Sequence, residues 1–106
     1  MKLRWTAEAV ADRNAIYDYI EARSPRAAVT LDTLFSQKAS DLARHPAMGR
    51  PGRVPGTREW VAHRNYILIY DQTDTDVRIL RLLHAARQWP PGVESRRHPA
   101  ANRPIL

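Results

Sequence analysis

The amino-acid sequence predicts an α+β fold in which a short N-terminal strand and an antiparallel helical hairpin precede a three-stranded antiparallel sheet. Apolar residues recur at helical spacing between residues 7 and 44, with a single Ser-Pro break inside that stretch. From residue 58 onward the pattern changes to short runs of branched and aromatic residues, which is typical of strands. The chain has 106 residues, which suffices for one domain with one hydrophobic core.

The N-terminal part predicts a strand followed by the first helix. Residues 2–5 alternate polar and apolar side chains, and Thr6 is suited to cap a helix that runs to about Ala22. Arg13 falls within the apolar face of this helix, so we expect its methylene groups to lie on the core while its guanidinium reaches solvent. The face itself consists of Ala9, Ile16, Tyr19 and Ile20.

A second helix is predicted to start at Ser24-Pro25, because serine caps helices and proline suits the first helical position. It should end near Arg44, since Pro46 disfavours helical conformation in the residue before it. The short connection between the two helices predicts an antiparallel hairpin. Its apolar stripe is interpreted as core and consists of Ala28, Leu31, Leu34, Phe35 and Leu42.

Three strands are predicted after a loop, residues 49–57, that is broken by glycine and proline. They cover residues 58–62, 66–70 and 77–84, with a turn at 63–65 and a polar connection at 71–76. In the last strand, alternation places Val77, Ile79 and Arg81 on one face and Arg78, Leu80 and Leu82 on the other. Residues 1–90 are predicted to form the domain, and the proline- and arginine-rich residues 91–106 a weakly ordered tail.

The net charge of +6 lies entirely in residues 44–106, which hold eleven arginines and five acidic residues. Arginines on the loop and on adjacent strands are predicted to gather into one positive surface. Such a surface implies an anionic partner, either nucleic acid or an acidic protein segment, although a solvated basic face is the simpler alternative. The guanidinium group suits bidentate contact with phosphate or carboxylate, which favours a partner.

Composition excludes several classes of protein. No run approaches the roughly 20 apolar residues that a membrane-spanning helix needs. The chain contains no cysteine and its N-terminus resembles no secretory signal, so we expect a cytoplasmic protein without disulfides. The four histidines lack the spacing of a metal site, and no glycine motif for phosphate binding is present. We therefore expect neither a metal nor a cofactor.

Several segments resemble the RelE/ParE superfamily of toxins from bacterial toxin–antitoxin operons. The similarity covers about residues 3–90 in the order of that family, and its predicted topology is the family's topology. The segments that carry it are Thr6-Ala7-Glu8-Ala9, Ser24-Pro25-Arg26-Ala27-Ala28, His45-Pro46-Ala47-Met48-Gly49-Arg50-Pro51, Val54-Pro55-Gly56-Thr57-Arg58-Glu59, Asn65-Tyr66-Ile67-Leu68-Ile69-Tyr70 and Ile79-Leu80-Arg81-Leu82-Leu83-His84-Ala85-Ala86-Arg87-Gln88.

The resemblance implies a small toxin that is neutralised by a cognate antitoxin. RelE-like members cut messenger RNA in the ribosomal A site, whereas ParE-like members poison DNA gyrase and have no known nuclease chemistry. RelE-like nucleases place an arginine on the central strand where this chain has Ile67, and they commonly carry a tyrosine near the C-terminus. No tyrosine follows Tyr70 here, so the sequence favours the ParE-like branch, a binding inhibitor that is not an enzyme.

Two sets of residues are therefore candidates for binding. Arg81, His84, Arg87 and Trp89, at the last strand and its exit, are predicted to bind the target, most simply DNA gyrase. Arg50, Arg53, Arg58 and Arg64 are predicted to bind acidic residues of the antitoxin or of the target. The alternative is a metal-independent, ribosome-dependent mRNA endoribonuclease that uses Arg58, Arg81 and His84, with His84 as base. An inactive homologue that scavenges antitoxin is a third reading.

Overall fold

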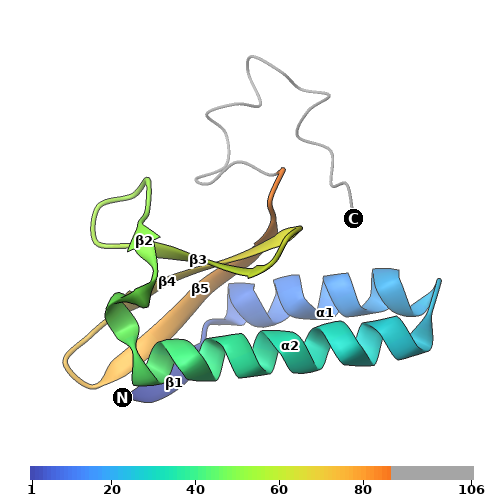
Figure 1. Ribbon diagram of the computed structural model, residues 1–106, viewed down its shortest axis with the longest axis horizontal. Helices are drawn as coiled ribbons and strands as arrows, with labels where there is room; N and C mark the ends of the chain where they lie inside the picture. Colours follow the sequence, from blue (N-terminus) through green and yellow to red (C-terminus); the bar gives the residue numbers. More distant parts are fainter. Residues whose placement is uncertain (87–106) are drawn as a thin grey trace.

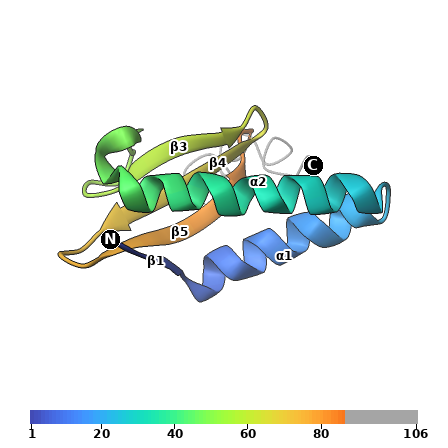
Figure 2. The same cartoon turned by 60° about the horizontal axis from the view of Figure 1, so that its bottom comes forward.

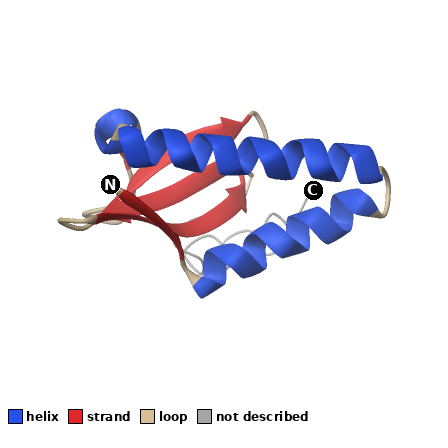
Figure 3. Cartoon of the chain, turned by 90° about the horizontal axis from the view of Figure 1, so that it is seen from below, coloured by secondary structure: helices blue, strands red, loops and turns tan. Residues whose placement is uncertain are grey.

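The structure is a computed structural model that describes residues 1–86 of the chain. Its elements follow one another as β1 (Lys2–Trp5), α1 (Ala7–Glu21), α2 (Pro25–Arg44), the short 3₁₀ helix η1 (Pro46–Met48), β2 (Arg50–Pro51), β3 (Arg58–His63), β4 (Tyr66–Gln72) and β5 (Asp76–His84). The predicted α+β class is confirmed, and both helices lie on one face of a single sheet (Figures 1 and 3). The predicted tail, residues 91–106, lies outside the described residues.

The sheet has five strands in the order β1-β5-β4-β3-β2; the predicted N-terminal strand joins the three predicted sheet strands, and β2 was not predicted. The predicted three strands form its antiparallel centre, β5-β4-β3. β1 pairs in parallel with the edge of β5. The helical hairpin provides part of the long connection between these two strands, which a parallel pair requires. The two-residue strand β2 pairs with the outer edge of β3. It brings the start of the loop at residues 49–57, which we call the arginine loop, into the sheet.

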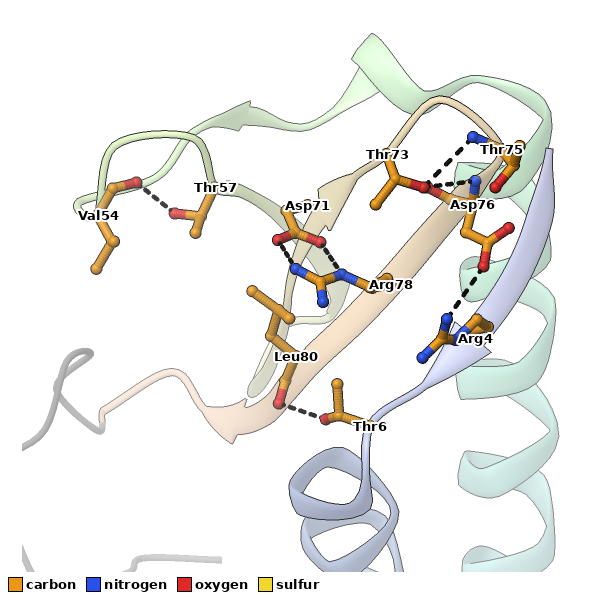
Figure 4. A network of polar contacts seen from close by, with 10 residues as sticks. All are labelled: Arg4, Thr6, Val54, Thr57, Asp71, Thr73, Thr75, Asp76, Arg78 and Leu80. Carbon is orange, nitrogen blue, oxygen red and sulfur yellow. Dashed lines mark hydrogen bonds and ion pairs between the residues drawn. The ribbon is translucent and has the colours of Figure 1, made fainter.

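Both predicted helix caps are confirmed. The Thr6 hydroxyl accepts a hydrogen bond from the Ala9 backbone amide at 3.1 Å and donates one to the Leu80 carbonyl at 3.0 Å (Figure 4). Thr6 therefore starts α1 and ties that start to β5. The Ser24 hydroxyl accepts from the Ala27 amide at 3.2 Å, and Pro25 takes the first helical position of α2.

Arg13 keeps 20% of its side chain exposed, but its guanidinium is paired with neighbouring residues. Its guanidinium makes a bidentate ion pair with Asp32 of α2, at 2.6 and 3.0 Å, and donates to the Ser36 hydroxyl at 2.6 Å. The same guanidinium lies 4.8 Å from the ring centroid of Trp5. Arg13 thus crosslinks the two helices, since an ion partner on α2 stabilises the head group better than exposure above an apolar face.

Helix α2 extends beyond the sheet on which it packs. Its 20 residues make it about 30 Å long, whereas the six residues of β3 span about 20 Å. The C-terminal part of α2 lies over the sheet, and the N-terminal part continues with α1 past the strand ends (Figure 2). Ala28, Phe35 and Leu42 of the predicted stripe are buried, but Leu31 and Leu34 are only half-buried.

A β-bulge alters the predicted faces of β5. The register shifts between Ile69 and Tyr70 of β4, so that Ile69 pairs with Arg81 while Tyr70 pairs with Ile79. Leu80 is the extra residue, and after it the alternation is reversed. The core therefore contains Leu82 together with Val77 and Ile79, which the predicted strict alternation had placed on opposite faces.

A polar network secures the edge formed by β1, β5 and the β4–β5 turn (Figure 4). Arg78 makes a bidentate pair with Asp71 at 2.9 and 2.6 Å, and Arg4 contacts Asp76 at 3.4 Å. The Thr73 hydroxyl accepts from the Asp76 amide at 3.0 Å and closes the turn. These arginines are neutralised by local carboxylates, so the positive charge of the strands is spread over pairs and not gathered in one free surface.

Candidate functional site

The face of the sheet that turns away from the helices carries a row of side chains from four strands. The register places Arg50 of β2 opposite Glu59 of β3, Glu59 opposite Ile69 of β4, and Ile69 opposite Arg81 of β5. A hollow of about 100 Å³ lies on this face. It is lined by Arg50, Arg53, Glu59, Ile67, Ile69, Leu83, His84 and Ala85. An apolar floor with guanidinium groups and a carboxylate at its rim can hold a polar or acidic side chain of a partner protein.

Arg50 is held over this hollow by Glu59. Its Nη2 donates to Glu59 Oε1 at 3.1 Å, with the arginine side chain 66% exposed and the glutamate 12% exposed. Arg53 is also exposed and lines the same hollow. The exposed guanidinium of Arg50 can contact a carboxylate or phosphate of a partner while the largely buried Glu59 carboxylate still holds it in place.

Arg81 is bound to Asp12 of α1. Its Nε and Nη2 donate to the two Asp12 oxygens at 2.7 and 2.9 Å, and Asp12 Oδ2 also accepts from the Leu82 amide at 3.0 Å. Hydrogen bonding to Asp12 raises the pKa of Arg81 further above its usual value. Within the described residues, β1 pairs with β5 only as far as Trp5, opposite Ile79. Asp12 therefore accepts the hydrogen bond from the Leu82 amide that a neighbouring strand would otherwise accept.

Arg58 lies on the other side of β3 from the hollow. Its Nη1 donates to the Gly49 carbonyl at 2.7 Å, beside the phenol of Tyr70. The Tyr70 hydroxyl donates to the Pro46 carbonyl at 2.7 Å and accepts from the Gly49 amide at 2.9 Å. Burial raises the pKa of Tyr70, although the Gly49 amide and Arg58 act in the opposite direction. Arg58 and Tyr70 together hold the start of the arginine loop on the sheet.

His84 borders the hollow, but its ring lies on the helix-facing side of the sheet, where the register pairs it with Tyr66. Its Nδ1 accepts from the Ala86 amide at 3.1 Å, and its ring lies edge-on to Tyr66 with 5.5 Å between the ring centroids. A nitrogen that accepts a hydrogen bond carries a lone pair, so the neutral imidazole holds its proton on Nε2. In this tautomer the Ala86 amide engages Nδ1, and Nε2 carries a proton that can be donated.

The structure brings together only part of each predicted set. Arg50, Arg53 and His84 line one hollow, whereas Arg58 contacts the backbone near Gly49 and Arg81 contacts Asp12. Arg64 is exposed in the turn between β3 and β4. Arg87 and Trp89 lie outside the described residues. The binding roles of all these residues stay predictions.

Three residues to which the sequence pattern assigned no role position the arginines. Asp12 binds Arg81, Glu59 binds Arg50, and Tyr70 binds the Gly49 amide beside Arg58. Asp12 and Arg81 are separated by 69 residues, and Tyr70 and Gly49 by 21, so no local pattern joins them. Glu59 directly follows Arg58 and pairs with Arg50, which only the register of β2 could reveal.

Two further properties limit what residues 1–86 can do. No three histidine, aspartate or glutamate side chains in this part of the chain come close enough to hold a metal ion. None of its helices combines the length and apolar character needed to cross a membrane.

Comparison with known proteins shows the family. Residues 3–89 match the family model described as the ParE toxin of the type II toxin–antitoxin system parDE. The chain is 41% identical over 90 residues to the putative toxin Y4kP of Sinorhizobium fredii, covering 84% of this chain and 93% of that protein. It is 40% identical over 83 residues to toxin RelE2 of Caulobacter vibrioides, covering 78% and 93%.

A solved structure agrees with these sequence matches. A chain of the chromosomal ParDE toxin–antitoxin system from P. aeruginosa superposes with a TM-score of 0.71 at 30% identity, covering 79% of this chain and 95% of that one. The strand, helical hairpin and sheet are therefore shared, as the resemblance to the RelE/ParE superfamily implied. This protein belongs to the ParE toxin family of type II toxin–antitoxin systems.

Proposed function

We propose that this toxin inhibits growth by binding DNA gyrase in the cytoplasm and that its cognate antitoxin neutralises it. Membership of the ParE family supports a toxin with an antitoxin partner. Gyrase is the target of the ParE-like branch that the sequence resembles. The target-binding surface is the outer face of the sheet near the end of β5, where Arg50, Arg53 and His84 line the hollow.

The observation that carries this proposal is the chemistry of His84. Metal-independent cleavage of RNA needs a base for the 2′-hydroxyl, a proton donor for the leaving oxygen and cations for the developing charge. The His84 lone pair is engaged by the Ala86 amide, and Arg58 and Arg81 are bound to the Gly49 carbonyl and to Asp12. The residues of the nuclease alternative are thus dispersed, which supports inhibition by binding.

The proposal is tested with purified toxin that has been separated from its antitoxin. Added to gyrase and relaxed plasmid, it should inhibit supercoiling and accumulate gyrase–DNA cleavage complexes. The matched experiment adds the same toxin to ribosomes programmed with messenger RNA. Cleavage at A-site codons there, with gyrase unaffected, would establish the nuclease alternative instead.

Replacing His84 with glutamine separates the two mechanisms. Glutamine keeps a hydrogen-bond donor and an acceptor but cannot exchange protons near neutral pH. A nuclease that used His84 as its base would lose at least about 100-fold in cleavage rate. A binding inhibitor should retain most of its effect on gyrase, because glutamine preserves a donor and an acceptor at this position.

A further inference from the structure

The helical hairpin carries a groove of about 490 Å³ on the side that turns away from the sheet. We call it the outer groove. One face of α1 supplies most of its wall, and β1 and α2 contribute one residue each. These residues are Val10, Arg13, Asn14 and Tyr17 of α1, Trp5 of β1 and Asp32 of α2. Figure 3 shows both helices in front of the sheet, so the outer groove lies on the outside of the molecule, across the sheet from the hollow.

Helix α1 carries apolar side chains on two faces. Towards the sheet it buries Ala9 and Ile16 in the core. On its outer face Val10 remains 43% exposed, and Val29, one turn before Asp32 on the neighbouring α2, is 55% exposed. A surface helix normally has polar residues opposite the core, and a helix that is apolar on both faces is normally covered on both. Within the described residues, the outer side of the hairpin lacks such a cover.

The outer groove is electrically neutral. Among the described residues that line it, only Arg13 and Asp32 are charged, and they pair with each other at 2.6 Å. The chain as a whole carries a net charge of +6, so most encounters between two copies are repulsive. An acidic or phosphate-bearing partner is attracted to open cations, which this groove does not offer. An identical neutral face meets it without repulsion, and its aromatic residues, Trp5 and Tyr17, are of the kind enriched in interface cores.

We propose that the outer groove is the centre of a two-fold symmetric interface with a second copy of this chain. The helices of one chain pack on those of the other, and Val10 and Tyr17 of each chain contact the outer groove of its partner. Two helices side by side are about 20 Å wide, and the 15 residues of α1 are about 22 Å long. Two such faces bury about 900 Å² in total, an area typical of weak, reversible complexes. We therefore expect a dissociation constant of about 10–100 µM.

The test is sedimentation velocity of the full-length toxin, freed of antitoxin, over about 1–300 µM. The sedimentation coefficient should rise with concentration from that of a monomer to that of a dimer. Val10→Arg should weaken dimerisation at least about 30-fold, because the two-fold axis places an unpaired charge of each chain in the same interface. The matched control is Val61→Arg, which makes the same change at a 51% exposed valine of β3 on the other side of the sheet. It should leave the dissociation constant within about threefold of the original.

A site-specific photocrosslinker identifies what covers the outer groove. The chain contains no cysteine, so Asn14→Cys supplies a single thiol at an exposed position of the groove, to which a benzophenone is attached. Illumination should join two toxin chains. The control is Ser40→Cys, an exposed position of α2 that does not line the outer groove, and it should give no such product. Both positions lie on the surface, so neither label disturbs the core, and this readout does not depend on the folding of Val10→Arg.

The outcomes decide between a second copy and the other possible occupants. A toxin that stays monomeric at about 300 µM would refute the inference, and so would a dimer that Val10→Arg leaves intact. With the antitoxin present, capture of the antitoxin from position 14 in place of a second toxin chain would assign the outer groove to the antitoxin and overturn the inference. Capture of the toxin's own residues 87–106 would overturn it as well. None of these readouts involves gyrase, so this inference and the proposed target fail independently.

Discussion

The ion pair between Asp12 and Arg81 provides the sharpest test of how the β5 edge is built. Replacing Asp12 with alanine removes the two carboxylate oxygens to which Arg81 Nε and Nη2 donate, and the acceptor of the Leu82 amide. The Asp12 and Arg81 side chains are only 13% and 21% exposed, so the charge left behind is poorly solvated. Breaking a buried pair costs about 3–5 kcal/mol and orphaning an amide about 1–3 kcal/mol. Partial exposure lowers the first figure, and we expect a total loss of about 3 kcal/mol.

The assay is urea denaturation followed by tryptophan fluorescence. Asp12→Asn should lose about half as much as Asp12→Ala, because the amide oxygen still accepts from Leu82 while the charge is lost. The control is Asp41→Ala, which removes an ion pair with Arg44 between side chains that are 37% and 67% exposed. That control should cost less than about 0.5 kcal/mol. A loss below that value for Asp12→Ala would refute the role assigned to the pair.

Two further predictions concern the anchor of the arginine loop, and a third concerns the buried tyrosines. Gly49→Ala places a methyl group 2.5 Å from the Tyr70 hydroxyl and 2.8 Å from the Glu59 carbonyl. This overlap should lower the free energy of unfolding by about 2 kcal/mol in the same denaturation assay. An unchanged midpoint would contradict the close contact. Tyr70→Phe leaves the Gly49 amide without its acceptor and should cost about 1–3 kcal/mol, so stability equal to the original chain would argue against the clamp. Burial raises the pKa of Tyr66 and of Tyr70 above 10.0. As the pH rises, the two phenols therefore lose their protons more readily in the unfolded chain than in the folded one. Their contribution to the free energy of unfolding should be complete below about pH 10 and should fall as the pH rises further. An ultraviolet difference titration in which all four tyrosines ionise together at their ordinary pKa would contradict this.

Local signals predicted the elements that depend on neighbouring residues. Thr6 and Ser24 cap helices through bonds to amides three residues away, and Pro25 and Pro46 restrict the backbone next to them. These effects act within one turn of helix, so a single sequence contains all the information they need. The helical hairpin and the three central strands were predicted for this reason.

Features that depend on distant residues were not predicted. The parallel pairing of β1 with β5 joins Lys2 to Asp76, and the two-residue strand β2 exists only because β3 lies beside it. The bulge at Leu80 interrupts an alternation that continues in the sequence, and it moves Leu82 into the core. The exchange of inward- and outward-facing positions after a bulge depends on the register with the partner strand. The sequence of β5 alone does not show it.

The arginines illustrate the same limit at the candidate site. The sequence showed many cations, and their recurrence suggested one positive surface. The carboxylates that neutralise Arg13 and Arg81 lie 19 and 69 residues away, so composition could not show which cations remain open to a partner. In the fold, Arg50 stays 66% exposed although it pairs with Glu59, and Arg26 and Arg64 are exposed as well.

We propose that this ParE-family toxin binds gyrase. The most direct measurement is plasmid supercoiling by purified gyrase with increasing amounts of the free toxin, with and without the antitoxin. Inhibition of supercoiling with accumulation of cleaved DNA complexes, reversed by the antitoxin, is the expected result. Undiminished supercoiling at every toxin concentration, together with cutting of ribosome-bound messenger RNA by the same preparation, would contradict the claim.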